Sequence, residues 1–83
     1  MSNFILQKLK HYVDMYVAHA HPELEIFQIS VKNCVSLGDI HGAECVADFD
    51  NDTIYQVLYD AKNKTVSVIE YKKVDEVLYQ IVK

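Results

Sequence analysis

The chain has 83 residues, of which 51% are hydrophobic, and it carries a formal net charge of −4 without a single arginine. This length predicts one small domain, residues 1–83, that buries about 60–65% of the surface of its unfolded chain. The negative charge and the lack of clustered cations argue against a nucleic-acid partner or an anionic membrane surface. No stretch approaches the ~20 consecutive apolar residues of a membrane-spanning helix. The start, Met1-Ser2-Asn3, lacks the basic region and cleavage site of a secretory signal, so we expect a cytoplasmic protein.

The first element is predicted to be a long amphipathic helix. Ser2 can cap a helix that begins at Asn3 or Phe4, and Pro22 ends it. Apolar residues recur at steps of three and four residues, which places them on one helical face: Ile5, Leu9, Tyr12, Val13, Tyr16, Val17 and Ala20.

Four strands are predicted after the helix, over residues 24–37, 43–50, 53–60 and 65–71. The first of them should turn Phe27, Ile29, Val31 and Val35 toward the core and Cys34 away from it, with a bend or a bulge near Asn33. Residues 38–42, which contain both glycines of the chain, are expected to form a loop.

Alternation along the later strands predicts which of their side chains meet. The inward rows are expected to be Cys45, Ala47 and Phe49 on one strand and Tyr55, Val57 and Tyr59 on the next. Phe49 opposite Tyr55 would require a loop at Asn51-Asp52-Thr53. In the last pair, Val66 and Val68 are expected to face Tyr59 and Val57 across a tight turn at Lys62-Asn63.

A short second helix is predicted at the end of the chain. Val74, Val77, Leu78, Ile81 and Val82 follow helical spacing, and Asp75 and Glu76 suit the positive end of a helix. The fold class is therefore α+β, in the order α-β-β-β-β-α. We expect a four-stranded antiparallel sheet with the long N-terminal helix packed on one face.

The two cysteines, Cys34 and Cys45, are predicted to be free thiols. They would lie on adjacent strands and, unless a bulge intervenes, point to opposite faces of the sheet, so that their Cβ vectors diverge and no disulfide forms. The expected cytoplasmic setting points the same way.

Residues that could carry chemistry are few, and each has a simpler interpretation. Asp48-Phe49-Asp50-Asn51-Asp52 resembles the start of a calcium loop, but Thr53 and Tyr59 stand where that loop needs glycine and glutamate. His19, His21 and His41 lack the spacing of a zinc site. A nucleophilic pair of His41 with Cys34 or Cys45 has no accompanying signature. We therefore expect no metal, no cofactor and no catalysis.

Two resemblances suggest a binding role. The segment Tyr55-x-Val57-x-Tyr59-Asp60-Ala61-Lys62-Asn63-Lys64-x-Val66 resembles the closing hairpin of PepSY-type domains, although Asn63-Lys64 replaces the usual Thr-Gly. The resemblance covers about residues 13–68. A helix followed by a meander also resembles the cystatin-like fold, although residues 31–35 are not the cystatin Q-x-V-x-G motif. Both resemblances imply a non-catalytic binding or inhibitory module.

A third resemblance is to double-stranded RNA-binding domains, through the order α-β-β-β-α. The lysine-rich start of the last helix in those domains is reduced here to Lys72-Lys73 before Asp75-Glu76. This composition argues against RNA binding.

The sequence predicts a small accessory module that binds another protein or a second copy of itself. The expected partner-binding residues are Ile54, Leu58, Ile69 and Tyr71, on the sheet face that the long helix does not cover. Tyr12, Tyr16, Tyr55 and Tyr59 are assigned to the core between helix and sheet. The alternative is a small-ligand protein or minor enzyme with a pocket between helix and sheet near His41.

Overall fold

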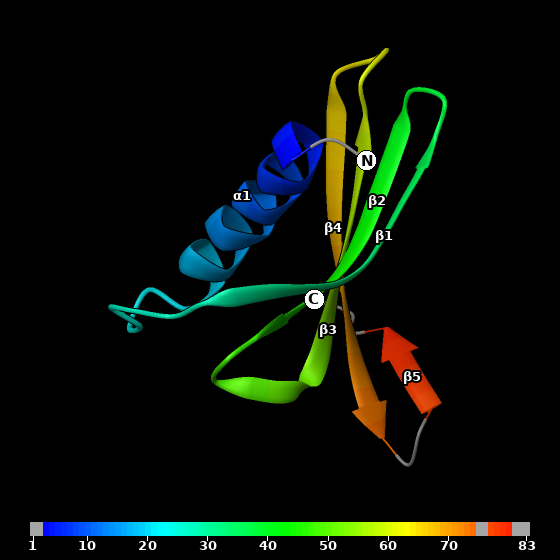
Figure 1. Cartoon of the computed structure of the whole chain (residues 1–83). Helices are drawn as coiled ribbons and strands as arrows, with labels where there is room; N and C mark the ends of the chain where they lie inside the picture. Colours follow the sequence, from blue (N-terminus) through cyan, green and yellow to red (C-terminus); the bar gives the residue numbers. More distant parts are fainter. Residues whose placement is uncertain (1–2, 75–76, 81–83) are drawn as a thin grey trace.

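The computed structural model describes residues 3–74 and 77–80 of the chain. In the described residues the elements are one helix and five strands: α1 (Asn3–Ala20), β1 (Ile29–Leu37), β2 (Ile40–Ala47), β3 (Asp50–Asp60), β4 (Thr65–Val74) and β5 (Val77–Gln80). The strands form an antiparallel sheet in the order β1-β2-β3-β4-β5, and α1 lies across one face of it (Figure 1). The α+β class and the order of the helix and the first four strands are confirmed.

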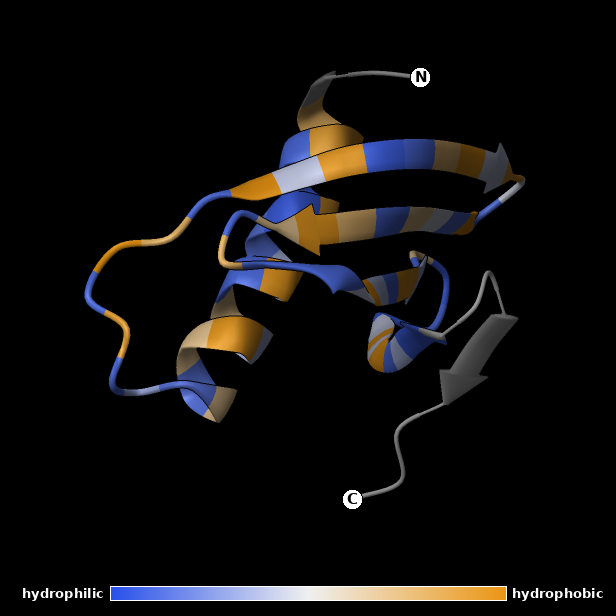
Figure 2. Ribbon diagram, turned by 90° about the horizontal axis from the view of Figure 1, so that it is seen from below, coloured by the Kyte–Doolittle hydropathy of each residue, from blue (hydrophilic) through white to orange (hydrophobic). Residues whose placement is uncertain are grey.

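The core lies between α1 and the sheet. The helix contributes Leu9, Val13 and Val17, which are fully buried, and the sheet contributes Tyr55 and Val57. Hydrophobic and polar residues alternate along β1 to β4 (Figure 2), and α1 contacts each of these four strands. No helix in the described part of the chain is long and apolar enough to cross a membrane.

A β-bulge in β1 reverses the alternation of that strand. The register with β2 shifts between Val31 and Asn33, so Lys32 is the additional residue. Cys34 therefore packs against the core, whereas Val35 is 59% exposed on the opposite face. A bend or a bulge near Asn33 was expected, and the structure has the bulge. The prediction that Val35 points inward and Cys34 outward was wrong for this reason.

The β1–β2 connection is shorter than expected. β1 runs to Leu37 and β2 begins at Ile40, so that Gly38 and Asp39 alone form the turn, and Gly42 lies inside a strand. Gly38 has a φ of 60°, which glycine adopts without a steric penalty. The Asp39 carbonyl accepts a hydrogen bond of 2.8 Å from the Ala61 amide, which joins this turn to the next hairpin.

The predicted register of β3 with β4 is confirmed, whereas that of β2 with β3 is wrong at its turn. Val57 pairs with Val68 and Tyr59 with Val66. Phe49, however, lies in the β2–β3 turn and is 39% exposed, and Tyr55 pairs with Cys45. The turn is formed by Asp48 and Phe49, three residues before the expected loop at Asn51-Asp52-Thr53. At the start of β3, where the register with β2 shifts, the Asp50 carboxylate accepts hydrogen bonds from the Asp52 amide and the Thr53 hydroxyl.

The C-terminal helix expected from Val74 to Val82 is not seen. Val74 ends β4, and Val77–Gln80 form β5, which pairs with β4. Residues 75–76 and 81–83 of the expected helix lie outside the described residues. A short, valine-rich apolar run fits a strand as well as a helix, and the edge of β4 offers it backbone hydrogen bonds.

Candidate functional site

The face of the sheet opposite α1, called here the helix-free face, carries an apolar patch at one end. The patch consists of four large apolar side chains: Val35, Leu37, Ile40 and Leu58, exposed by 59%, 75%, 44% and 41% respectively. Leu37 pairs directly with Ile40, and Gly42 lies between Val35 and Leu58 in the strand order. Because Gly42 has no side chain, Val35 and Leu58 face each other across the width of one strand.

The four residues predicted to bind a partner lie on this same face. Ile54 pairs with Tyr71 across β3 and β4, Leu58 pairs with Ser67, and Ile69 pairs with Gln56. Leu58 belongs to the apolar patch, whereas the other three are half-buried. Sequence reasoning missed Val35, Leu37 and Ile40, because the reversal at the bulge and the two-residue turn decide where they point.

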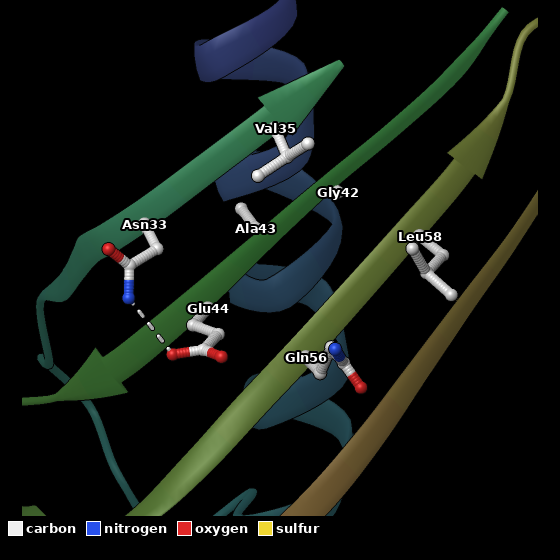
Figure 3. A pocket seen from close by; sticks show the side chains of 7 residues that line it. All are labelled: Asn33, Val35, Gly42, Ala43, Glu44, Gln56 and Leu58. Carbon is white, nitrogen blue, oxygen red and sulfur yellow. Dashed lines mark hydrogen bonds between the residues drawn. The ribbon is translucent and has the colours of Figure 1, made fainter. Parts of the chain in front are cut away.

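A hollow of about 160 Å³ lies in the helix-free face above Gly42. Figure 3 shows it from outside, with α1 behind the strands. Gly42 lines it, and Leu58 Cδ2 lies over Gly42, 2.9 Å from the place that a Cβ atom of this residue would take. Val35 and Leu58 supply its apolar walls.

A row of three polar side chains, called here the polar row, closes the other end of the hollow. Asn33, Glu44 and Gln56 are paired directly across β1, β2 and β3. The Asn33 amide Nδ2 donates a hydrogen bond of 3.2 Å to Glu44 Oε2 (Figure 3). Within residues 3–74 this is the only side-chain hydrogen bond to the Glu44 carboxylate, so Oε1 is able to accept from another donor.

His41 lies on the opposite, helix-facing side, in a polar group with three neighbours. Its Nδ1 is hydrogen-bonded to Ser36 Oγ at 2.6 Å, and its ring stacks on Tyr59 at 6.2 Å between centroids. Lys8 Nζ donates a hydrogen bond of 3.1 Å to the Tyr59 hydroxyl and lies 4.5 Å from the centroid of the ring. This hydrogen bond raises the pKa of Lys8, so its cationic form is favoured.

The four tyrosines assigned to the core lie there. Tyr12 packs on Tyr59 with 5.8 Å between ring centroids, and Tyr16 meets Tyr55 edge-on at 5.9 Å. The Tyr16 hydroxyl also donates a hydrogen bond of 2.6 Å to Oε1 of Glu70, a carboxylate buried beneath the helix. Glu70 was not among the residues predicted to lie in the core. The inward position of its neighbour Val68 could have placed Glu70 on the same face, since the two residues are two apart in β4.

Both cysteines are thiols, as expected, although the reason differs from the prediction. The bulge turns Cys34 to the same face as Cys45, and the two occupy different rungs of the ladder, Cys34 opposite Ala43 and Cys45 opposite Val31. Burial raises the pKa of the Cys45 thiol to about 11, with a smaller contribution from Cys34. At neutral pH Cys45 is therefore a protonated core side chain and a poor nucleophile.

No group of three or more histidine, cysteine, aspartate or glutamate side chains within the described residues is arranged to hold a metal ion. Asp50, in the segment that resembles a calcium loop, directs its carboxylate at Thr53 and at the backbone of its own turn. His21 lies against Phe49, with 5.3 Å between ring centroids.

Comparisons with protein-family models, with curated proteins and with solved structures found no match for this chain. The resemblances to PepSY-type and cystatin-like domains therefore stay predictions.

Proposed function

We propose that this chain is a non-catalytic interaction module that binds another protein through its helix-free face. The observation that carries the proposal is the exposure of Val35, Leu37, Ile40 and Leu58 on the same face of three adjacent strands. Contiguous exposed apolar surface on a small domain marks sites of interaction with other macromolecules.

The arrangement of the two faces supports this proposal. An antiparallel sheet with one covered face normally presents polar side chains on the other face. Here the helix-facing side is already closed by α1, which buries Leu9 and Val13 completely. The apolar residues on the helix-free face therefore add nothing to that core, and a protein surface that covered them would remove them from water at a gain of roughly 25 cal/mol per Å² of apolar area.

The geometry around His41 favours binding over catalysis. Ser36 and His41 are direct partners in the β1–β2 ladder, so their hydrogen bond is that of an ordinary cross-strand pair. The hollow at Gly42 and a second one of about 250 Å³ beside Lys32 and Asp48 are not lined by His41. The His41 ring is instead packed on Tyr59.

The proposal can be tested by photo-cross-linking in the source cells followed by reconstitution. A benzophenone amino acid would be placed at Leu37 on the helix-free face and, as a matched control, at Met15, which is 57% exposed on α1. The protein cross-linked through position 37 would then be purified and titrated against the wild-type chain and the variants Leu58→Asp, Leu37→Asp and Met15→Asp by calorimetry.

We expect both helix-free-face variants to weaken binding at least about tenfold, because each places a carboxylate in a desolvated apolar contact. Met15→Asp should bind like the wild type. Leu37→Asp keeps the test valid if Leu58→Asp fails to fold, since Leu37 is the more exposed of the two residues. Equal affinity of all four proteins, or cross-links that form from Met15 alone, would contradict the proposal.

A further inference from the structure

The size of the hollow above Gly42 indicates what it can hold. Small-molecule sites occupy about 300–1,000 Å³ and bury most of their ligand. A hollow of about 160 Å³ that opens to solvent is too small for such a ligand, but it is large enough for one side chain of a partner protein. Pockets of this kind at protein interfaces receive the few anchor residues that dominate binding, with tryptophan, tyrosine and arginine the commonest among them.

One end of the hollow is apolar and the other is polar, and this difference indicates which of the three anchor residues, tryptophan, tyrosine or arginine, fits it best. Val35 and Leu58 line one end, where an aliphatic stem can lie. At the other end stands the polar row, with the Glu44 carboxylate between the amides of Asn33 and Gln56. Oε1 of the Glu44 carboxylate is the acceptor here for a group that carries N–H donors and a positive charge, since Oε2 already accepts from the Asn33 amide Nδ2.

We propose that the hollow above Gly42 is the socket for an arginine side chain of the partner protein. The stem of the arginine crosses Val35 and Leu58, and the guanidinium reaches the Glu44 carboxylate in the polar row. A planar guanidinium presents its N–H donors as a fork that matches a carboxylate such as Glu44, whereas a lysine ammonium is a compact charge without this planar arrangement of donors. The inference rests on the proposed function and adds the chemistry of the partner.

The composition of the chain indicates where the arginine comes from. The chain contains no arginine, so a second copy of it has none to insert. Its net charge of −4 favours association with a partner of opposite charge. The occupant is therefore a basic segment of a different protein.

The socket can be tested without knowledge of that protein. The full ¹⁵N-labelled chain would be titrated with acetyl-leucyl-arginyl-leucine amide, and backbone and side-chain amide shifts would be followed by NMR. The same titration would be made with peptides in which lysine or norleucine replaces the central arginine, and with the variants Glu44→Gln and Glu25→Gln. Glu25 is exposed and lies outside the hollow, so its variant changes the net charge equally.

We expect saturable shifts at Gly42, Glu44 and Gln56, weaker shifts with the lysine peptide and the weakest with norleucine. Glu44→Gln should lower the affinity for the arginine peptide by about fivefold, the value of a solvated ion pair of good geometry, and Glu25→Gln should leave it unchanged. Equal binding of the arginine and norleucine peptides, or an unchanged affinity in Glu44→Gln, would overturn the socket.

These outcomes are separate from those of the proposed function. A cross-linked partner that binds normally to Glu44→Gln but not to Leu37→Asp would support the proposed interface and contradict the arginine socket. A second copy of the chain as the cross-linked partner would also support the interface and contradict the socket, because the chain contains no arginine.

Discussion

Asp50 organises the start of β3, directly after the β2–β3 turn, through its carboxylate. Oδ2 accepts a hydrogen bond of 2.7 Å from the Thr53 hydroxyl, and Oδ1 accepts one of 2.9 Å from the Asp52 amide. The hydrogen bond from Thr53, followed by that from the Asp52 backbone, lowers the pKa of Asp50 below its ordinary value of 3.8. Thr53 is buried, so the loss of its partner would leave its hydroxyl without this acceptor.

The lowered pKa makes stability depend on pH in a defined direction. The charged form of Asp50 stabilises the folded chain at pH values above the ordinary pKa, and this contribution disappears as the pH falls through the folded-state pKa. We expect Asp50→Asn to lose about 0.5–1 kcal/mol at pH 7, a value reduced for the solvent around this group. The loss should be smaller at pH 2.

Urea unfolding of both proteins at pH 7 and pH 2 measures this difference. Asp39→Asn, at an exposed position in another turn, is the control and should change neither value by more than about 0.5 kcal/mol. If Asp50→Asn lowers the free energy of unfolding by the same amount at both pH values, the charge of the Asp50 carboxylate does not contribute to stability.

At the scale of elements, the β1–β2 hairpin depends on the conformation of Gly38. A Cβ atom at this position would meet nothing within 4 Å, so any cost of a side chain there is conformational and not steric. We expect Gly38→Ala to destabilise the chain by about 1 kcal/mol, because its φ of 60° is unfavourable for alanine. Gly38→Asn should cost less, since asparagine tolerates this region.

Thermal unfolding followed by circular dichroism compares the three proteins, with the midpoint of Gly38→Asn expected between those of the wild type and Gly38→Ala. An alanine variant as stable as the wild type would mean that the turn adopts another conformation in solution.

Much of the fold could be predicted because it depends on local patterns. The apolar spacing of α1 and the position of Pro22 define the helix, and the alternation in β3 and β4 fixes the pairing of Val57 with Val68. The side chains turned over by the Lys32 bulge could not be assigned, because one inserted residue reverses the faces of every residue after it. The strand β5 depends on a tertiary feature, the available edge of β4, which periodicity in a ten-residue segment does not show.

At the scale of the whole molecule, the sheet face that carries the candidate site could be predicted from the sequence, but the hollow beside Gly42 could not. The uncovered second face follows from the fact that one helix covers one face of a sheet, so Leu58 could be chosen from its alternation alone. The hollow required Val35 and Leu58 on either side of Gly42, and that arrangement arises when the bulge and the short turn combine. The apolar patch and the hollow thus share their origin in the β1–β2 hairpin.

An exposed apolar patch on a chain of this size has a consequence for its behaviour in solution. Two copies can bring their helix-free faces together, and we expect weak, reversible self-association at high concentration. Leu37→Lys should reduce it, because the charged head group resists removal from water, while the free energy of unfolding stays within about 0.5 kcal/mol of that of the wild type. Met15→Lys alters the net charge equally and lies on α1, so it should leave the association unchanged.

Sedimentation velocity over a range of concentrations distinguishes the two variants. The sedimentation coefficient of the wild type and of Met15→Lys should rise with concentration, whereas that of Leu37→Lys should stay near the monomer value. Both positions are exposed and both substitutions add the same charge. A difference in self-association between the two variants is therefore due to the position of the substitution and not to its charge. Equal loss of association in both variants would contradict self-association through the helix-free face, because the added lysine lowers the mutual repulsion of two copies with a net charge of −4 and cannot by itself weaken their association.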